Sequence, residues 1–517
     1  MKYIFLIISL FTAFTASAQK PDKHWYHSKP TRSNMGIDLD KAYASEYVKR
    51  EAKDIVVAVI DGGTDVNHED LKDVLWVNTK EIPGNGLDDD KNGYIDDVHG
   101  WNFIGGPNHT MVGGDNLEIT RLVAKWDQDY KDGGDINDAS YQFYLKMKED
   151  VQKNRDGALA SYNKINKVSE VLTQLKEMLG KENPTAEELE NISGDGNMIT
   201  VLGKGIAKMM KQQGTSFKDF EEEIKGQADY FYNKANFHYN IEFNSRMIVQ
   251  DDYSNSSERY YGNWDVVGPD AGHGTHVTGI IGAKRGNGIG LDGVADHVKI
   301  MVVRVVPDGD ERDKDVANGI RYAVDMGAQI INMSFGKGYK WDKNIVDSAV
   351  AYAESKGVLL VHAAGNNSSN NDIKGNYPND TLWGGKTFAS NWIEIGASQL
   401  KKKELATGFS NYGKDNVDIF SPGRDIYSSI PDNKYAYFNG TSMAAPVAAG
   451  VAALVWSRYP ELTAVQLKEI LMESGKKIRN KVILPGTSDK IRFKELCRSG
   501  RLINAYNALK LADEKTK

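Results

Sequence analysis

The stretch FNGTSMAAPVAAG, residues 438–450, places a serine, Ser442, among glycine, alanine, valine and methionine. The chain then continues as VAALVWSRY, a composition typical of a buried helix. A serine at the start of a helix lies beside unpaired backbone N–H groups and at the positive end of the helix dipole. Such a serine is usually an ordinary N-cap. A chemical role for Ser442 therefore depends on partners elsewhere in the chain.

Short apolar runs elsewhere in the sequence indicate strands that are buried on both faces. They occupy residues 54–60, 298–306, 328–335, 357–365 and 392–398. Helical patterns alternate with them, at 315–327, 344–357 and 442–459. This alternation predicts an α/β fold in three layers, with a mostly parallel central sheet flanked by helices.

Residues 107–260 have a different composition, rich in Lys, Glu, Asp, Asn and Tyr. Apolar residues recur there with helical spacing, at Val168, Val171, Leu172, Leu175 and Leu179. We predict a helical insertion that divides the α/β unit into residues 19–106 and 261–510. The insertion either regulates the protein or binds a partner, or it is a tolerated surface elaboration, and the sequence leaves both interpretations open.

The bulk properties exclude several classes of protein. The 517 residues are 40% hydrophobic and carry a formal net charge of −7, so the chain can bury a large core and has no overall basic character for nucleic acid. Residues 1–18 resemble a secretory signal peptide, and no later stretch is long and apolar enough for a membrane helix. We expect an exported protein, in the periplasm, at the cell surface or in the medium. The single cysteine, Cys497, permits no internal disulfide and is expected to be a buried hydrophobe rather than a nucleophile.

Three further segments carry residues that could partner Ser442. Asp61 ends the strand at 54–60 and is followed by two glycines. His273 lies between Gly272 and Gly274 at the start of an apolar segment, and Asn366 follows the strand at 357–365. Ligands of parallel sheets bind beyond the carboxyl ends of the strands, where such residues would meet. Each one alone also fits a structural role, as a turn-capping acid, a buried histidine or a turn asparagine.

In chain order these residues form one of the known arrangements of an Asp-His-Ser triad. Five segments resemble the signature blocks of the subtilisin-like serine proteases, the subtilases: AVIDGGTDVNHEDL, HGTHVTGIIGA, INMSFG, AAGNN and NGTSMAAPVAAGVAAL. The resemblance covers roughly residues 36–106 and 261–510, and the layout is similar to exported bacterial subtilases with a helical insert between the Asp and His blocks.

The resemblance implies a role for each matching residue. Ser442 would be the nucleophile, His273 the general base and acid, and Asp61 the group that orients His273. The Asn366 amide and the Ser442 N–H would form the oxyanion hole. The edge that binds substrate would be formed by Ser334, Phe335 and Gly336. We expect a secreted serine endopeptidase that acts on polypeptides and needs no organic cofactor.

One alternative to this expectation follows from the same residues. A peptide-binding protein on a retired protease scaffold would use the same surface, although no catalytic residue is missing here. Residues 19–60 are also too few for the folding pro-domain that many exported subtilases carry. We therefore expect no such pro-domain ahead of Asp61.

Two segments could bind calcium as a structural ion. In DDDKNGYIDD, residues 88–97, the spacing matches the start of an EF-hand loop, with candidate ligands Asp88, Asp90, Asn92 and Asp96. The twelfth position is His99 rather than glutamate, and an acidic surface turn is the alternative. The resemblance implies a second site, with Asp70 and Asn287 as ligands. Calcium bound only to the folded state would stabilise loops that lack disulfides.

Overall fold

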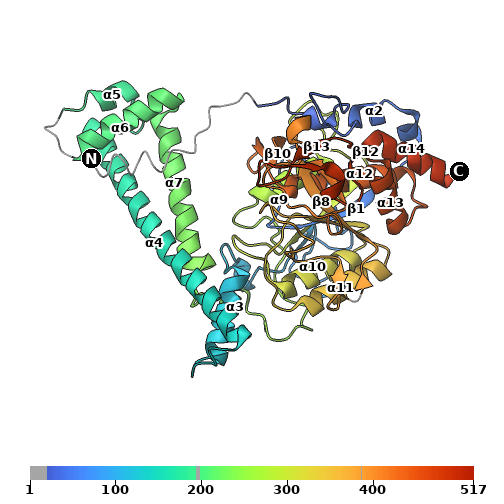
Figure 1. Cartoon of the computed structure of the whole chain (residues 1–517), viewed down its shortest axis with the longest axis horizontal. Coiled ribbons are helices and arrows are strands. Elements are labelled where there is room, and N and C mark those ends of the chain that lie inside the picture. Colours follow the sequence, from blue (N-terminus) through green and yellow to red (C-terminus); the bar gives the residue numbers. More distant parts are fainter. Residues whose placement is uncertain (1–19, 194–197, 386) are drawn as a thin grey trace. The chain divides into compact units, whose positions relative to one another are not determined.

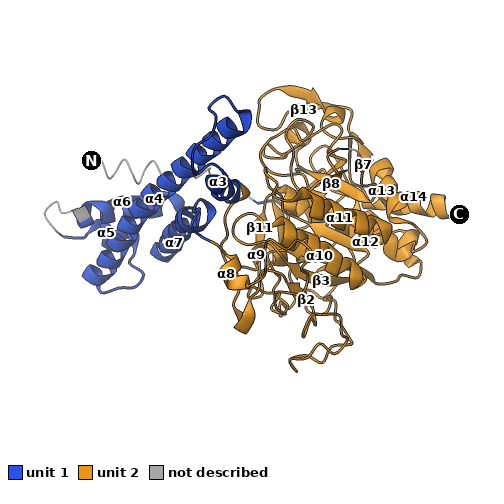
Figure 2. Cartoon of the chain, turned by 90° about the horizontal axis from the view of Figure 1, so that it is seen from below, with its two compact units in different colours: residues 1–20, 119–243 blue, residues 21–118, 244–517 orange. Residues whose placement is uncertain are grey.

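The computed structural model describes residues 20–193, 198–385 and 387–517, so the predicted signal peptide lies outside the described residues. The described residues form two compact units (Figure 2). The sheet unit takes residues 21–118 and 244–517, and the helical unit takes Lys20 and residues 119–243. Among the described residues, every helix is too short or too polar to span a bilayer.

The sheet unit is built on a nine-stranded sheet in the order β12-β15-β9-β8-β5-β4-β1-β3-β2. Its strands are β1 (Ile55–Asp61), β2 (Gly100–Asn102), β3 (Val298–Arg304), β4 (Ile330–Met333), β5 (Leu359–Ala363), β8 (Trp392–Ser398), β9 (Ile419–Pro422), β12 (Lys476–Lys477) and β15 (Arg501–Leu502). Every pairing in it is parallel except that of β12 with β15. The predicted mostly parallel sheet is confirmed.

Helices cover both faces of this sheet, which confirms the three predicted layers (Figure 1). One face packs against α9 (Gly272–Gly282), α12 (Thr441–Arg458), α13 (Ala464–Ser474) and α14 (Ala505–Thr516). The other face packs against α10 (Asp313–Asp325) and α11 (Lys343–Ser355). Each face of the sheet forms a hydrophobic core with its helices, and alternate residues of β1 point into the two cores. Val57 and Val59 lie on the α12 side, and Ala58 and Ile60 lie on the α10 side.

Local signals set the ends of several helices. Gly327 and Gly357 follow α10 and α11 with φ of 88° and 71°, a conformation that glycine adopts without strain. Thr463 caps α13 in a capping box. The smaller elements of the sheet unit are α2 (Leu39–Tyr43), α8 (Arg246–Val249), β6 (Thr381–Leu382), β7 (Thr387–Phe388), β10 (Ile426–Ile430), β11 (Lys434–Phe438), β13 (Lys481–Ile483) and β14 (Lys490–Arg492).

The helical unit contains the long helix that the apolar spacing predicts. Its elements are α3 (Glu118–Asp129), whose first residue belongs to the sheet unit, α4 (Ala139–Leu179), α5 (Ala186–Glu190), α6 (Met198–Gln213), α7 (Phe217–Asn233) and a π-helical turn (Lys234–His238). Leu172 and Leu175 of α4 are buried in its core. The unit is shorter than the segment 107–260 predicted from composition, because residues 107–118 and 244–260 belong to the sheet unit. Polar residues of those two segments are buried in ion pairs, such as Arg246 with Asp315, so their composition does not mark an exposed insertion.

Candidate active site

Asp61 and His273 are joined directly at the carboxyl end of β1. The Asp61 carboxylate is buried, and its Oδ1 accepts hydrogen bonds from His273 Nδ1 at 2.8 Å and from the Gly62 N–H at 2.7 Å. His273 is the second residue of α9, and its side chain is 43% exposed. With Nδ1 donating to Asp61, the neutral ring keeps Nε2 as its proton acceptor.

The environment of His273 favours its protonated form. Burial by itself lowers the pKa of His273, but the negative charge of Asp61 and its hydrogen bond outweigh burial, and the net pKa is raised above the ordinary value of 6.5. The buried acid therefore stabilises the imidazolium that would form during proton transfer.

The glycine after His273 permits the close approach of α9 to β1. A Cβ atom on Gly274 would lie 2.0 Å from the Gly63 carbonyl oxygen and 3.3 Å from Asp61 Oδ1. Any larger residue would push the helix away from Asp61. His276, one turn further along α9, is fully buried, and its Nε2 bonds to the Ala436 carbonyl oxygen of β11 at 3.1 Å, so it is a structural histidine.

Ser442 is the second residue of α12 and is half-buried. Its carbonyl accepts a hydrogen bond of 2.9 Å from Ser334 Oγ, which links the nucleophile candidate to the predicted substrate edge. Helices α9 and α12 pack against each other. In the described part of the chain, no hydrogen bond joins Ser442 Oγ to His273, whose Nδ1 bonds to Asp61.

The side chain of Asn366 is held in one orientation. Its Oδ1 accepts hydrogen bonds from the Thr441 N–H at 2.9 Å and from Thr441 Oγ1 at 3.1 Å, which leaves Nδ2 as a free donor. A Cβ atom on Gly440 would lie 3.5 Å from the Ser442 nitrogen and 3.6 Å from Asn366 Nδ2. Both donors therefore border the same small space, as an oxyanion hole requires. Sequence reasoning missed Thr441, whose only signal is a hydroxyl directly before Ser442.

The predicted substrate edge follows β4. Ser334 is buried, Phe335 is half-buried and Gly336 is exposed. A Cβ atom on Gly336 would lie 2.8 Å from Asn376 Oδ1, so Asn376 fills the space beside this edge.

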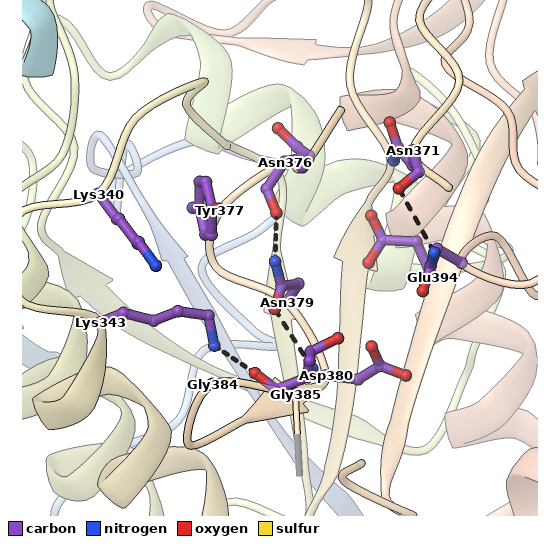
Figure 3. A pocket seen from close by; sticks show the side chains of 13 residues that line it. Lys340, Lys343, Asn371, Asn376, Tyr377, Asn379, Asp380, Gly384, Gly385 and Glu394 are labelled. Carbon is purple, nitrogen blue, oxygen red and sulfur yellow. Dashed lines mark hydrogen bonds between the residues drawn. The ribbon is translucent and has the colours of Figure 1, made fainter. Parts of the chain in front are cut away.

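Asn376 also lines a polar cavity of about 360 Å³ (Figure 3). Carboxylates of Asp380 and Glu394 and the amine of Lys343 lie along its wall. Burial and the neighbouring charges of Glu394 and Asp418 raise the pKa of Asp380 to about 6. A pKa of about 6 means that Asp380 keeps its proton to a higher pH than an ordinary aspartate does.

The predicted EF-hand-like loop brings two of its four candidate ligands together. Carboxylate oxygens of Asp88, Asp90 and Glu81 lie within 4.8 Å of one another. The Asp96 carboxylate instead accepts backbone hydrogen bonds from residues 84–86. Asn92 Oδ1 accepts from the Tyr94 N–H at 2.7 Å. Glu81 was missed because it lies outside the loop motif.

Asp70 and Asn287 are in direct contact. Asn287 Nδ2 donates to Asp70 Oδ1 at 2.6 Å, and the Leu291 N–H donates to Oδ2 at 3.2 Å. Burial raises the pKa of Asp70, although both hydrogen bonds oppose the shift. Lys23 Nζ donates to the Gly290 carbonyl of the same loop at 2.7 Å. Asp70 is thus already partnered within the protein.

Cys497 is buried as predicted, and burial raises the pKa of its thiol to about 11.

Several known proteins are similar to this chain. The model of the Subtilase family matches residues 52–485. The chain is 36% identical over 238 residues to the thermophilic serine proteinase of Bacillus sp. (strain AK1), covering 46% of this chain and 52% of that protein. It is 34% identical over 268 residues to thermitase of Thermoactinomyces vulgaris, covering 50% of this chain and 85% of thermitase. A solved structure described as proteases from Pseudoalteromonas arctica PAMC 21717 is 20% identical, with a TM-score of 0.46, covering 96% of this chain and 100% of that one.

Proposed function

Because the chain belongs to the subtilase family, we propose that it is a serine endopeptidase that hydrolyses peptide bonds through Asp61, His273 and Ser442. The observation that carries the proposal is the 2.8 Å hydrogen bond between Asp61 and His273, made where β1 ends. The proposal is supported by Ser442 at the start of α12, which packs against the helix of His273.

In the first half of the proposed reaction, Ser442 Oγ attacks the carbonyl carbon of the substrate. His273 Nε2 takes the hydroxyl proton and then gives it to the amine nitrogen as the C–N bond breaks. The product is an ester between Ser442 and the acyl part of the substrate. Water then attacks this ester with His273 again as base, and the free acid leaves. Asp61 stays ionised and orients the ring throughout.

The oxyanion of each tetrahedral intermediate would be bound by Asn366 Nδ2 and the Ser442 N–H. Thr441 fixes the amide by two hydrogen bonds, so the donor needs no reorganisation during the reaction. Extended polypeptides would pair with the 334–336 edge through their backbone, a mode that is largely independent of sequence.

We also propose a structural calcium ion at Glu81, Asp88 and Asp90. Their carboxylate oxygens lie within 4.8 Å of one another, and carboxylate oxygens are the ligands that calcium prefers. Asp70 and Asn287 offer a second oxygen-bearing site, although their mutual hydrogen bond would have to open.

We propose further that the protein is exported, on the composition of residues 1–18. N-terminal sequencing of protein recovered outside the cytoplasm would then begin at Gln19. A mature chain that still begins at Met1 would contradict export through this segment.

The test of the proposed reaction is peptide hydrolysis by the purified wild-type protein and by Ser442→Ala. We expect the wild type to cleave a denatured protein substrate and the variant to lose all but a trace of this activity. Equal cleavage by both would refute the role of Ser442. Peptide binding without cleavage by the wild type would instead favour a retired peptide-binding protein.

A further inference from the structure

Directly after the proposed substrate edge lies a buried lysine, Lys337, whose side chain is 1% exposed. Its Nζ contacts Glu118 Oε2 at 2.6 Å, the Glu311 carbonyl oxygen at 2.7 Å and Asp313 Oδ1 at 2.6 Å. An ammonium has three donors, so these three acceptors use all of them. A buried cation is strongly destabilised when any of its hydrogen-bond partners moves away, because water cannot replace that partner. The side chain therefore fixes the position of its own backbone.

The backbone of Lys337 is fixed as well. Its N–H donates to the Tyr377 carbonyl at 2.9 Å, and its carbonyl accepts from the Tyr377 N–H at 3.0 Å. The other end of the edge is held by the bond from Ser334 Oγ to the Ser442 carbonyl. Phe335 and Gly336 thus lie between two anchors, one at the nucleophile and one at Lys337.

The Asp313 carboxylate and the Glu118 backbone, which hold Lys337, have further hydrogen bonds of their own. Asp313 Oδ2 accepts from the Trp341 N–H at 2.9 Å and from the Asp342 N–H at 2.7 Å. The Glu118 N–H donates to Asp310 Oδ2 at 2.7 Å. The charge cluster is therefore a rigid support.

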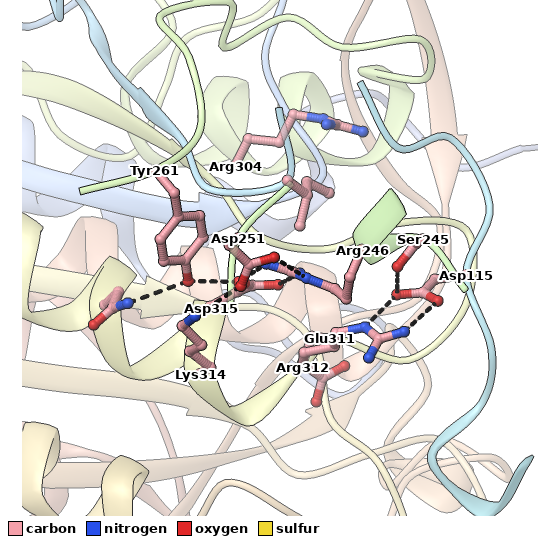
Figure 4. A network of polar contacts seen from close by, with 12 residues as sticks. Asp115, Ser245, Arg246, Asp251, Tyr261, Arg304, Glu311, Arg312, Lys314 and Asp315 are labelled. Atoms are coloured by element: carbon pink, nitrogen blue, oxygen red, sulfur yellow. Dashed lines mark hydrogen bonds and ion pairs between the residues drawn. The ribbon is translucent and has the colours of Figure 1, made fainter. Parts of the chain in front are cut away.

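Glu118 is the last residue of the sheet unit before the helical unit begins. Just upstream, Asp115 pairs with Arg312 at 2.7 and 2.9 Å and accepts from Ser245 Oγ at 2.8 Å (Figure 4). Ser245 lies where the chain returns from the helical unit. Both connections to that unit are thus tied to residues 311–313, the segment that holds Lys337.

We propose that Lys337 is a positioning residue for the 334–336 edge, and that Glu118 and Asp313 act through it. This inference rests on the proposed function, because it assigns a support to the proposed substrate edge. The edge aligns the substrate backbone with Ser442, and a displacement of about 1 Å at such a site can lower the rate by about 10²-fold. Glu118, the residue that leads into the helical unit, therefore helps to position the 334–336 edge.

The test compares two reactions of Ser442 in each variant. One is hydrolysis of a fluorogenic peptide with four residues before the scissile bond, which must pair with the edge. The other is phosphonylation by a small alkyl fluorophosphonate, which reaches Ser442 without the edge. For Lys337→Met we expect kcat/KM for the peptide to fall by about 10–100-fold, with a change of no more than about threefold in the phosphonylation rate.

The matched control is Lys314→Met. Lys314 is 2% exposed and its Nζ also contacts three acceptors, on Asp251, Asp252 and Glu258, but none of these described contacts involves residues 334–337. We expect this variant to lower the unfolding temperature while the ratio of the two rates stays at the wild-type value. Glu118→Gln keeps a hydrogen-bond acceptor for Lys337 but removes the negative charge. Its kcat/KM for the peptide should also fall, by a smaller factor than in Lys337→Met.

Equal losses in both reactions for Lys337→Met, or a ratio changed as much by Lys314→Met, would overturn the positioning role and leave the proposed function standing. If Lys337→Met does not fold, the ratio for Glu118→Gln decides. A wild-type protein that neither cleaves the peptide nor reacts with the fluorophosphonate would overturn the proposed function and this inference with it.

Discussion

Replacing Thr441 by valine should slow the reaction without removing any group that touches the substrate. Thr441 is fully buried, and its Oγ1 donates to Asn366 Oδ1 and accepts from the Gly365 N–H, both at 3.1 Å. Valine has nearly the same shape, so Thr441→Val deletes these two bonds and little else. The Thr441 N–H still holds Asn366 Oδ1 at 2.9 Å.

The sizes of the effects follow from these contacts. An oxyanion donor such as Asn366 is worth about 10²–10³ in kcat, or about 2.7–4 kcal/mol. Losing one of the two bonds that orient it removes about 1 kcal/mol. We therefore expect kcat to fall by about 5–10-fold, with KM nearly unchanged. The unpaired Gly365 N–H should lower the free energy of unfolding by about 1–3 kcal/mol.

Steady-state kinetics on Thr441→Val, Asn366→Ala and the double variant, with urea unfolding of each, would measure these effects. Because Thr441 acts through Asn366, the double variant should be no slower than Asn366→Ala alone. Thr407→Val is the matched control, since Thr407 is fully buried and donates only to the Ala397 carbonyl. Additive losses in the double variant, or an unchanged kcat for Thr441→Val, would refute the reasoning.

Three more predictions follow from the described contacts. Activity requires neutral His273, and Asp61 raises the pKa of that ring, so kcat/KM should rise with pH through a midpoint above 6.5; a pH–rate profile of Asp61→Asn should show a lower midpoint at much reduced activity, and an unmoved midpoint would contradict this coupling. A calcium chelator should speed thermal inactivation of the wild type but have little further effect on Asp88→Asn, and equal chelator sensitivity would remove the calcium proposal for that loop. In Gly279→Ala the added Cβ would lie 2.3 Å from Ser429 Oγ, which should lower the free energy of unfolding by about 1–3 kcal/mol in urea titrations; an unchanged value would contradict the close packing of α9.

The sheet was predictable because a parallel strand that is buried on both faces has a continuous run of apolar residues in its sequence. The runs at 54–60 and 392–398 match β1 and β8 to within one residue. Strands β2 and β9 were not predicted, because three or four residues carry no periodicity and owe their structure to the neighbouring strands. The resemblance supplied the site residues, and the structure adds the direct contact between Asp61 and His273.

Residues that act through distant partners could not be found in the sequence. Lys337 and Glu118 lie far apart in the chain, and nothing local marks either as buried. Spacing alone also grouped Asp96 with Asp88, whereas the backbone at Asp96 has φ of 56° and its carboxylate accepts hydrogen bonds from residues 84–86. The compact helical unit is shorter than the segment 107–260 predicted from composition, because composition does not distinguish an exposed charge from a buried ion pair.

The most direct test of the account is to react the folded protein with a fluorophosphonate and locate the adduct by mass spectrometry of its peptides. We predict a single adduct, on Ser442, in the wild type and a strong decrease in its rate of formation in His273→Ala. No adduct, or an adduct on another residue that forms equally fast without His273, would contradict a nucleophile at the start of α12 activated by the histidine of α9.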